Sequence, residues 1–409
     1  MANYNTTTLT GGLRVIHLPS TSPVVYCGFQ IAAGSRHELA GEEGLAHFCE
    51  HMTFKGTARR SALQVINHLE RVGGDLNAFT TKEATTFYAA VLREDVGRAA
   101  DLLCDIVFAS SYPESEVEHE KAVVCDEIES YNDSPAELIY DEFENLLFPG
   151  HPLGHNILGT ADQVRAFTAD DVLRFARRWY RPDNAVFFAS GDVDFSWLVR
   201  RLERLLKAPP QPSPKGEGAI CKVPEVKQSD AVITMNTHQA HVMIGTQAYS
   251  AHDPLRMPLY VLNNLLGGPG MSARLNLSLR ERNGLVYTVE SSMTSYGDTG
   301  TWAVYFGCDH HDVDRCLRLV RRELDRLASS PLTDRQLAAA KRQLKGQVGI
   351  GVDNREQFAL DFGKSFLHYG WENDLDSLCR RIDAVSPDDI LRVASSLFDP
   401  ARLSTLKIV

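Results

Sequence analysis

Residues 44–57 of the chain read GLAHFCEHMTFKGT, and this stretch contains the pattern His-x-x-Glu-His. On a helix, His47 and His51 lie one turn apart on the same face, so both imidazoles can bind one tetrahedral metal ion. Glu50 lies on that face as well and can take a proton from zinc-bound water. This order is the inverse of the HExxH zinc motif. The stretch therefore predicts a helix with two zinc ligands and a general base.

A second helical segment can supply a third ligand. Residues 115–130 read SEVEHEKAVVCDEIES and place Glu120 and Glu127 on one helix face, nearly two turns apart. Glu127 can complete a His, His, Glu zinc site, and Glu120 can then orient a ligand. The same run also fits a solvated acidic face, so the residues by themselves leave both interpretations open. Cys49 and Cys125 flank these positions and are expected to pack on the buried sides of the two helices.

The motif and its spacing resemble the inverzincins of the pitrilysin type, in the short-chain branch that is like the mitochondrial processing peptidase. Glu127 follows His51 at the distance that the family has, and Glu120 falls on the family's accessory catalytic glutamate. The resemblance implies one Zn²⁺ per chain, held by His47, His51 and Glu127. It also implies catalytic roles for Glu50 and Glu120.

The second half of the chain repeats the first. Residues 168–173, TADDVL, match residues 386–391, SPDDIL, and residues 94–107, EDVGRAADLLCDIV, correspond to residues 311–324, HDVDRCLRLVRREL, at a similar offset. The duplication predicts two halves of like fold. The second-half segment that corresponds to the motif, YVLNNLLGG at 260–268, contains no good zinc ligand. Metal chemistry is therefore expected in the first half only.

The predicted fold class is α+β, with two homologous α/β-sandwich halves. Strand-like segments at residues 12–19 and 24–34 precede the motif, and a helix, a break and a strand are expected over 168–193. The Pro- and Gly-rich residues 207–226 are a predicted linker between a catalytic zinc-binding domain, 1–206, and a substrate-binding domain, 227–409. The family resemblance implies that each half is a mixed sheet packed with helices and that the halves form a clam-like half-chamber.

The family resemblance also implies substrate-binding residues. Asn77, Ala78 and Phe79 resemble the family's edge strand, to which an extended peptide adds as a further strand. Arg280 and Tyr287 match the family's paired Arg and Tyr, which hold a substrate carbonyl and stabilise the oxyanion of the transition state. For all five residues, an ordinary structural or surface role remains the alternative.

Two acidic residues resemble the family's basic-peptide site. Glu137 and Asp141 lie one helical turn apart, where processing peptidases have acidic residues that bind an Arg near the cleavage point. A preference for basic peptides is therefore expected, and a solvated acidic helix face remains the alternative.

Composition restricts the class of protein. The chain has 409 residues, 44% of them hydrophobic and 23% charged, and a net charge of -11, which disfavours a nucleic-acid partner. Residues 1–20 have no basic region followed by an apolar core and are not Arg-rich, so we expect no secretory or transit signal there. No apolar run reaches membrane-spanning length. The eight scattered cysteines fit reduced thiols. We expect a cytoplasmic protein without a membrane partner.

The predicted function is zinc-dependent endopeptidase activity on short or unfolded peptides inside an enclosed chamber. Because Glu50, Arg280 and Tyr287 stand in one chain, the resemblance favours a homodimer. Two alternatives remain open. One is a non-catalytic scaffold of the same family, and the other is a catalytic subunit that requires a separate partner chain.

Overall fold

The computed structural model describes residues 4–206, 222–224, 227–370 and 375–409, and these form two compact units. Among the described residues, unit 1 contains 4–129, 156–206 and 351–370, and unit 2 contains 130–155, 222–224, 227–350 and 375–409. Among all the described residues, no helix is both long and apolar enough to cross a membrane.

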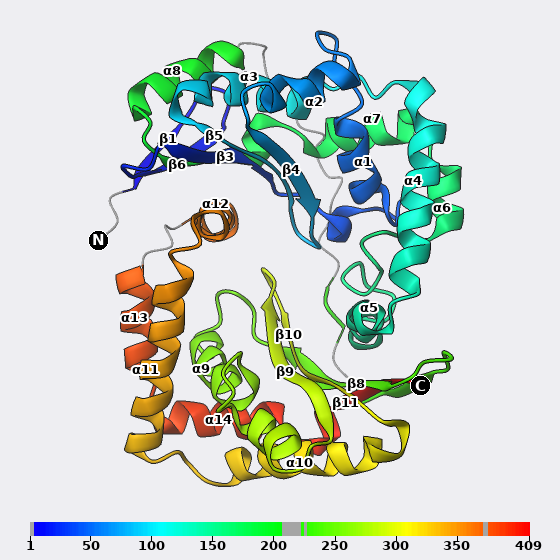
Figure 1. Ribbon diagram of the computed structural model, residues 1–409, viewed down its shortest axis with the longest axis vertical. Helices are drawn as coiled ribbons and strands as arrows, with labels where there is room; N and C mark the ends of the chain where they lie inside the picture. Colours follow the sequence, from blue (N-terminus) through cyan, green and yellow to red (C-terminus); the bar gives the residue numbers. More distant parts are fainter. Residues whose placement is uncertain (1–3, 207–221, 225–226, 371–374) are drawn as a thin grey trace. The chain divides into compact units, whose positions relative to one another are not determined.

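Unit 1 is built on a six-stranded mixed sheet of order β1-β2-β6-β3-β5-β4 (Figure 1). β2 and β6 run parallel, and the other neighbouring strands are antiparallel. The strands are β1 (Asn5–Thr8), β2 (Arg14–Pro19), β3 (Val24–Ile31), β4 (Asp75–Thr80), β5 (Thr85–Leu92) and β6 (Ala185–Gly191). β2, β3 and β6 confirm the strands expected around the motif and after the helix at 168–179.

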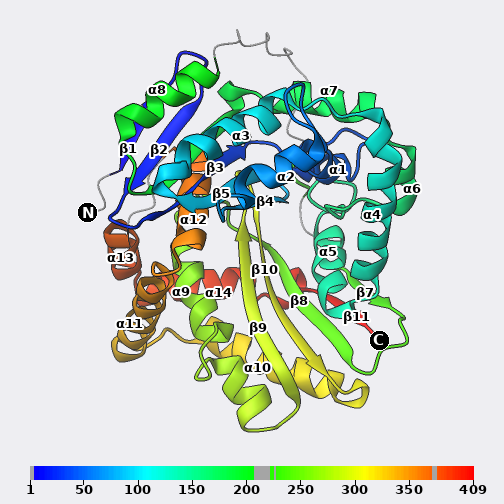
Figure 2. The same cartoon turned by 45° about the horizontal axis from the view of Figure 1, so that its top comes forward.

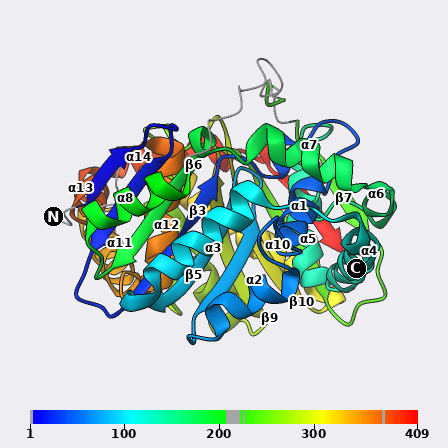
Figure 3. The same ribbon diagram turned by 90° about the horizontal axis from the view of Figure 1, so that it is seen from above.

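Helices cover both faces of the unit 1 sheet. α3 lies across β3 and β5, as Figure 3 shows from above. The ring of Phe108 in α3 packs edge to face against the ring of Phe29 in β3, with 4.9 Å between the ring centroids. The opposite face is covered by α12, whose Phe362 packs against Phe188 of β6. The helices are α1 (Leu45–Thr53), α2 (Ala62–Glu70), α3 (Val96–Ala109), α4 (Glu114–Asn132), α6 (Ala161–Ala166), α7 (Ala169–Trp179), α8 (Phe195–Leu205) and α12 (Arg355–Tyr369).

Unit 2 is built on a five-stranded sheet of order β7-β11-β8-β10-β9, in which only β7 and β11 are parallel. Its strands are β7 (Asp230–Ile233), β8 (Ala240–Ala248), β9 (Val286–Ser295), β10 (Gly300–Cys308) and β11 (Ser404–Ile408). Figure 2 shows β9 and β10 as a long hairpin at one edge. The order and the parallel pair reproduce β2-β6-β3-β5-β4 of unit 1, which confirms the predicted duplication and the α+β class.

Side chains of β10 alternate between the two faces of the unit 2 sheet, as the pleat requires. Trp302, Val304 and Phe306 enter the core formed with α9, α10 and α14, whereas Ala303 and Tyr305 enter the core formed with α5. The helices are α5 (Pro135–Leu147), α9 (Arg256–Gly267), α10 (Val313–Ser329), α11 (Asp334–Gly351), α13 (Leu375–Ala384) and α14 (Pro387–Leu397).

The compact units differ from the two halves of the sequence because each half contributes one helix to the other unit. α5 comes from the first half and packs on the unit 2 sheet, while α12 comes from the second half and packs on the unit 1 sheet. The expected division at 207–226 stays a prediction. Most of that predicted linker lies outside the described residues.

Candidate metal centre

The motif helix α1 begins at Leu45, after the N-cap residue Gly44, and a carboxylate from the preceding loop binds its first N–H groups. Gly44 has a φ of 96°, a conformation that favours glycine, and a Cβ there would lie 2.6 Å from the Leu158 carbonyl oxygen. The buried Glu38 accepts hydrogen bonds from the backbone N–H groups of Gly44 and Ala46, at 3.1 and 2.7 Å. A carboxylate at a helix N-terminus satisfies free N–H groups and interacts favourably with the helix dipole. Glu38 therefore fixes where the motif helix starts.

His47 and His51 of α1 face Glu127 of α4, and the two helices lie side by side in Figures 1 and 2. Glu127 lies 3.8 Å from Nε2 of His47 and 3.5 Å from Nε2 of His51. One ligand atom from each of the three residues lies within 4.8 Å of the others. Two imidazoles and one carboxylate are the donor set of many catalytic zinc sites. The three residues therefore fit a zinc ion, and α4 confirms the helix expected over 115–130.

The two histidines differ in how their surroundings shift the pKa of the ring. Burial, reinforced by the neighbouring His51, lowers the pKa of His47 to about 3, so its ring is neutral with a free lone pair. Burial would also lower the pKa of His51, but the surrounding Glu120, Glu50 and Glu127 outweigh burial and raise it. Nδ1 of His51 donates to Oε1 of Glu120 at 2.9 Å, so Nε2 is the nitrogen left for a metal.

Glu50 lies between the metal ligands and the end of β4. Its side chain is buried, and the Thr80 hydroxyl donates to its Oε2 at 2.5 Å. Burial raises the pKa of Glu50 to about 7, against the opposing effects of Thr80 and His51. A carboxylate with a pKa near 7 can both accept and release a proton near neutral pH. Thr80 was not expected from the sequence, because no local pattern ties it to the motif.

Glu120 is buried and joins His51 to a lysine. Its Oε1 accepts from His51, and its Oε2 forms an ion pair with Nζ of Lys55. Burial would raise the pKa of Glu120, but the hydrogen bonds from His51 and Lys55 outweigh burial and lower it. Lys55 stands in the quoted stretch 44–57, yet the helical spacing of the motif gives no sign of this contact.

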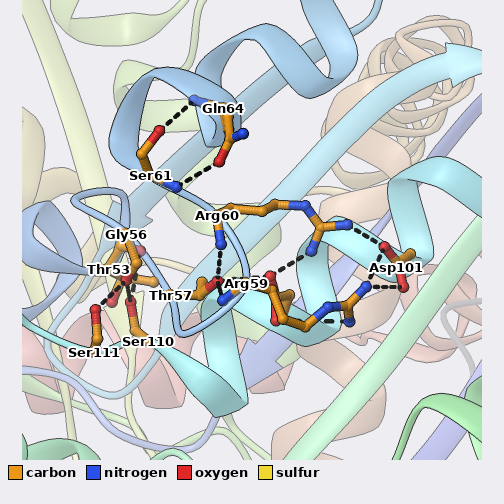
Figure 4. Close-up of polar contacts among 11 residues, drawn as sticks. Thr53, Gly56, Thr57, Arg59, Arg60, Ser61, Gln64, Asp101, Ser110 and Ser111 are labelled. Atoms are coloured by element: carbon orange, nitrogen blue, oxygen red, sulfur yellow. Dashed lines mark hydrogen bonds and ion pairs between the residues drawn. The ribbon is translucent and has the colours of Figure 1, made fainter.

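The turn after α1 is held by polar contacts (Figure 4). Ser110 donates through Oγ to the carbonyl oxygens of Thr53 and Gly56, at 2.9 and 3.1 Å. Thr57 donates to the buried Asp105 at 2.8 Å, and Arg60 forms ion pairs with both Asp101 and Asp105. We call Thr57, Arg60, Asp101 and Asp105 the turn clamp.

The predicted substrate strand is the edge strand of the unit 1 sheet. Asn77, Ala78 and Phe79 belong to β4, which pairs with β5 on one side and ends the strand order on the other. Phe79 is 38% exposed, and Thr80 at the end of β4 contacts Glu50. The strand is thus joined to the candidate metal centre, and its role in substrate binding stays a prediction.

The other predicted site residues lie in unit 2. The guanidinium of Arg280 lies 5.6 Å from the ring centroid of Tyr287, and Tyr287 is 81% exposed. Glu137 and Asp141 lie one turn apart on α5, where Asp141 accepts a hydrogen bond from the Tyr131 hydroxyl at 2.6 Å. Arg280 and Tyr287 thus lie close together, and the roles of all four residues in the reaction stay predictions.

The two halves of the chain match two models of one peptidase family. The model of insulinase, peptidase family M16, matches residues 14–161, and the model of the peptidase M16 inactive domain matches residues 166–344. An uncharacterized zinc protease of Streptomyces coelicolor is 37% identical over 395 residues, which cover 95% of this chain and 86% of the relative. The chain belongs to peptidase family M16. The resemblance drawn from the motif is thereby confirmed.

Further proteins match the chain over nearly its whole length. An uncharacterized zinc protease of Bacillus subtilis is 32% identical over 393 residues, which cover 96% of this chain and 95% of the relative. The crystal structure of a protease from Helicobacter pylori matches with a TM-score of 0.92 over 100% of both chains, at 22% identity. A peptidase M16 inactive domain from Pseudomonas fluorescens matches with a TM-score of 0.88, at 20% identity, over 99% of this chain and 97% of its own. The M16 fold therefore extends over both units.

Proposed function

We propose that this M16 family member is a zinc metalloendopeptidase that hydrolyses short or unfolded peptides. The observation that carries the proposal is the position of the buried Glu50 beside His47, His51 and Glu127. A general base without a metal site, or a metal site without a base, would not support hydrolysis. The names of the relatives as zinc proteases agree with it.

His47, His51 and Glu127 would hold one zinc ion per chain. When bound, zinc acts as a Lewis acid that polarises the scissile carbonyl and lowers the pKa of water. An Oε of Glu50 takes the proton from the attacking water and delivers it to the leaving amine. Thr80 holds the other carboxylate oxygen by its hydrogen bond, so Glu50 keeps one orientation. Glu120 keeps the His51 ring in the tautomer with a free Nε2.

The substrate would bind as an extended strand along β4. An edge strand offers unpaired backbone groups, which bind a peptide with little dependence on its sequence. Asn77, Ala78 and Phe79 supply this edge. Arg280 holds a substrate carbonyl, and the Tyr287 hydroxyl stabilises the oxyanion.

The acidic pair of α5 would select among peptides. Glu137 and Asp141 favour basic residues near the cleavage point, because two carboxylates one turn apart attract a guanidinium. An enclosed chamber of the M16 type admits unfolded chains and excludes folded proteins by size.

The protein would act as a homodimer in the cytoplasm. Both the metal ligands and the Arg280 and Tyr287 pair stand in one chain, so a second type of subunit is not required. The seven cysteines among the described residues are free thiols, and six of them are buried, which fits a reducing compartment.

The test combines metal analysis with cleavage of a quenched fluorescent peptide. We expect about one zinc per chain and cleavage by the parent. Glu50→Gln should keep the zinc and lose activity by about 10²- to 10⁴-fold, because the amide cannot accept the proton. Glu129→Gln is the matched control, since Glu129 is an exposed glutamate of α4, and it should behave like the parent.

Other outcomes would replace the proposal. Zinc without cleavage in the parent identifies a catalytic subunit that needs a partner chain. Neither zinc nor cleavage, even after zinc is added, identifies a scaffold. Full activity of Glu50→Gln would assign the base to another residue.

A further inference from the structure

Lys55 lies outside the His-x-x-Glu-His motif but contacts the network around the metal ligands. It follows the end of α1 at Thr53, and its Nζ pairs with Oε2 of Glu120. The Glu120 side chain is 4% exposed and that of Lys55 is 23% exposed. The contact is therefore largely shielded from water, where an ion pair is screened less than at the surface.

The backbone on both sides of Lys55 is fixed. The Lys55 N–H donates to the Met52 carbonyl at 3.1 Å. Gly56 forms an isolated β-bridge with Ser61, and Thr57 forms one with Ser110. The turn clamp then ties this segment to α3 through Asp105 and Asp101. The backbone of Lys55 is therefore held in place, and its ammonium group has a defined position against Glu120.

A chain of two contacts runs from this lysine through Glu120 to the metal ligand His51. Lys55 binds one oxygen of Glu120, and the other oxygen of Glu120 accepts from Nδ1 of His51 at 2.9 Å. With both oxygens engaged, the carboxylate cannot rotate without losing one partner. The plane of the His51 ring and the direction of its Nε2 are set by this carboxylate.

Lys55 also places a positive charge beside a group of carboxylates. The carboxylates of Glu50, Glu120 and Glu127 surround the two imidazoles. A divalent ion offsets much of this negative charge, and Lys55 offsets the charge of Glu120, with which it pairs. The ion pair of Lys55 with Glu120 brings a positive charge to this cluster.

We propose that Lys55 is a positioning residue of the metal centre, which fixes Glu120 and through it the ring of His51. The inference rests on the proposed function for the identity of the metal. It adds a residue that acts on metal affinity and on turnover and does not itself touch the substrate.

The test compares Lys55→Met, which removes the charge and keeps most of the length, with Lys55→Arg, which keeps the charge. Zinc affinity is measured in the full chain by competition with a coloured chelator, and the visible spectrum of the Co²⁺-loaded protein reports ligand geometry. We expect Lys55→Met to bind zinc about ten-fold more weakly and to change the Co²⁺ spectrum. Lys55→Arg should recover most of the affinity.

The matched control is Lys345→Met, because Lys345 is 33% exposed and pairs with Asp383 in unit 2. It should bind zinc like the parent. In the peptidase assay, Lys55→Met should lower kcat with little change in KM, since the substrate does not contact Lys55. Thermal unfolding verifies that each variant is folded. If Lys55→Met does not fold, Lys55→Gln takes its place in the comparison.

Two results would overturn the proposal. One is parent-like zinc affinity and spectrum in a folded Lys55→Met or Lys55→Gln. The other is an equal loss in Lys55→Met and Lys55→Arg, which would mean that the shape of the side chain matters and its charge does not. A parent that binds zinc but cleaves no peptide would refute the proposed function alone, because the zinc titration still tests Lys55.

Discussion

At the scale of single residues, burial decides which ionisable groups change their charge. His37 illustrates this outside the candidate metal centre. Burial lowers its pKa to about 4; nearby Glu83 opposes this effect, and Arg36 and His368 add to it. Nδ1 of His37 accepts a hydrogen bond from the Gly34 N–H at 3.2 Å, which requires an unprotonated nitrogen. The folded chain therefore keeps a neutral His37 down to mildly acidic pH.

This burial predicts a loss of stability in acid. Between the ordinary pKa of 6.5 and about 4, the unfolded chain binds a proton that folded His37 does not. Stability is therefore complete above pH 6.5 and falls as the pH decreases toward 4, by about 1.4 kcal/mol per pH unit. At pH 5 the free energy of unfolding should be about 2 kcal/mol lower through His37.

Urea unfolding at pH 7 and pH 5 measures the effect of His37. His37→Gln, which keeps an acceptor for Gly34, should lose less stability on acidification than the parent. His311→Gln is the control, since the His311 side chain is 79% exposed. An equal loss in the parent and in His37→Gln would show that acid acts elsewhere.

At the scale of elements, the turn clamp connects the end of α1 to α3. Asp105 is 4% exposed and contacts both Thr57 and Arg60. The ion pair of Arg93 with Asp192, at 2.8 Å, is by contrast exposed, with side-chain exposures of 61% and 48%. The chain thus offers a buried and an exposed pair for direct comparison.

We expect Asp105→Ala to lower the free energy of unfolding by about 3 kcal/mol, because the buried guanidinium of Arg60 loses one of its two ion-pair partners. Asp192→Ala should cost less than about 1 kcal/mol, since water screens the exposed pair. Urea unfolding of both variants at neutral pH provides the measurement. Equal costs would mean that the clamp adds no stability beyond that of a surface ion pair.

The helix periodicity of α1 and α4 could be read from the sequence, and so could the strands β2, β3 and β6. These elements depend on spacing along the chain, which is local information. The contact of Thr80 with Glu50 and the capping of α1 by Glu38 could not be read in this way. The Thr80 contact joins residues 30 positions apart, which meet only when the sheet and the helices pack. Glu38 is six residues before Gly44, but no periodic pattern shows how the loop between them folds back onto the helix start.

At the scale of the whole molecule, the exchange of α5 and α12 makes each half of the sequence incomplete. Without α12, the unit 1 sheet would expose Ile16, Val186 and Phe188, which are fully buried in the chain. Each such side chain contributes about 1.5–3 kcal/mol when it is buried. Without α5, the unit 2 sheet would likewise expose Met243 and Leu406.

We therefore expect residues 1–206 or 227–409, expressed alone, to aggregate or to unfold without cooperativity. Coexpression of 1–206 with 207–409 restores every covering helix and should yield a soluble complex that copurifies. Size-exclusion chromatography and thermal unfolding provide the readouts. A soluble fragment 1–206 with a cooperative transition would show that the exchanged helix is dispensable.

Residue type and periodic spacing were enough to predict the family, the duplication and the candidate set His47, Glu50, His51 and Glu127. The tertiary structure alone decided that Glu120 engages Lys55, that Thr80 reaches Glu50, and that α5 and α12 cover the sheets of the opposite halves. These contacts join residues far apart in the chain. They depend on how apolar faces are covered and buried charges are paired, and a linear pattern carries neither kind of information.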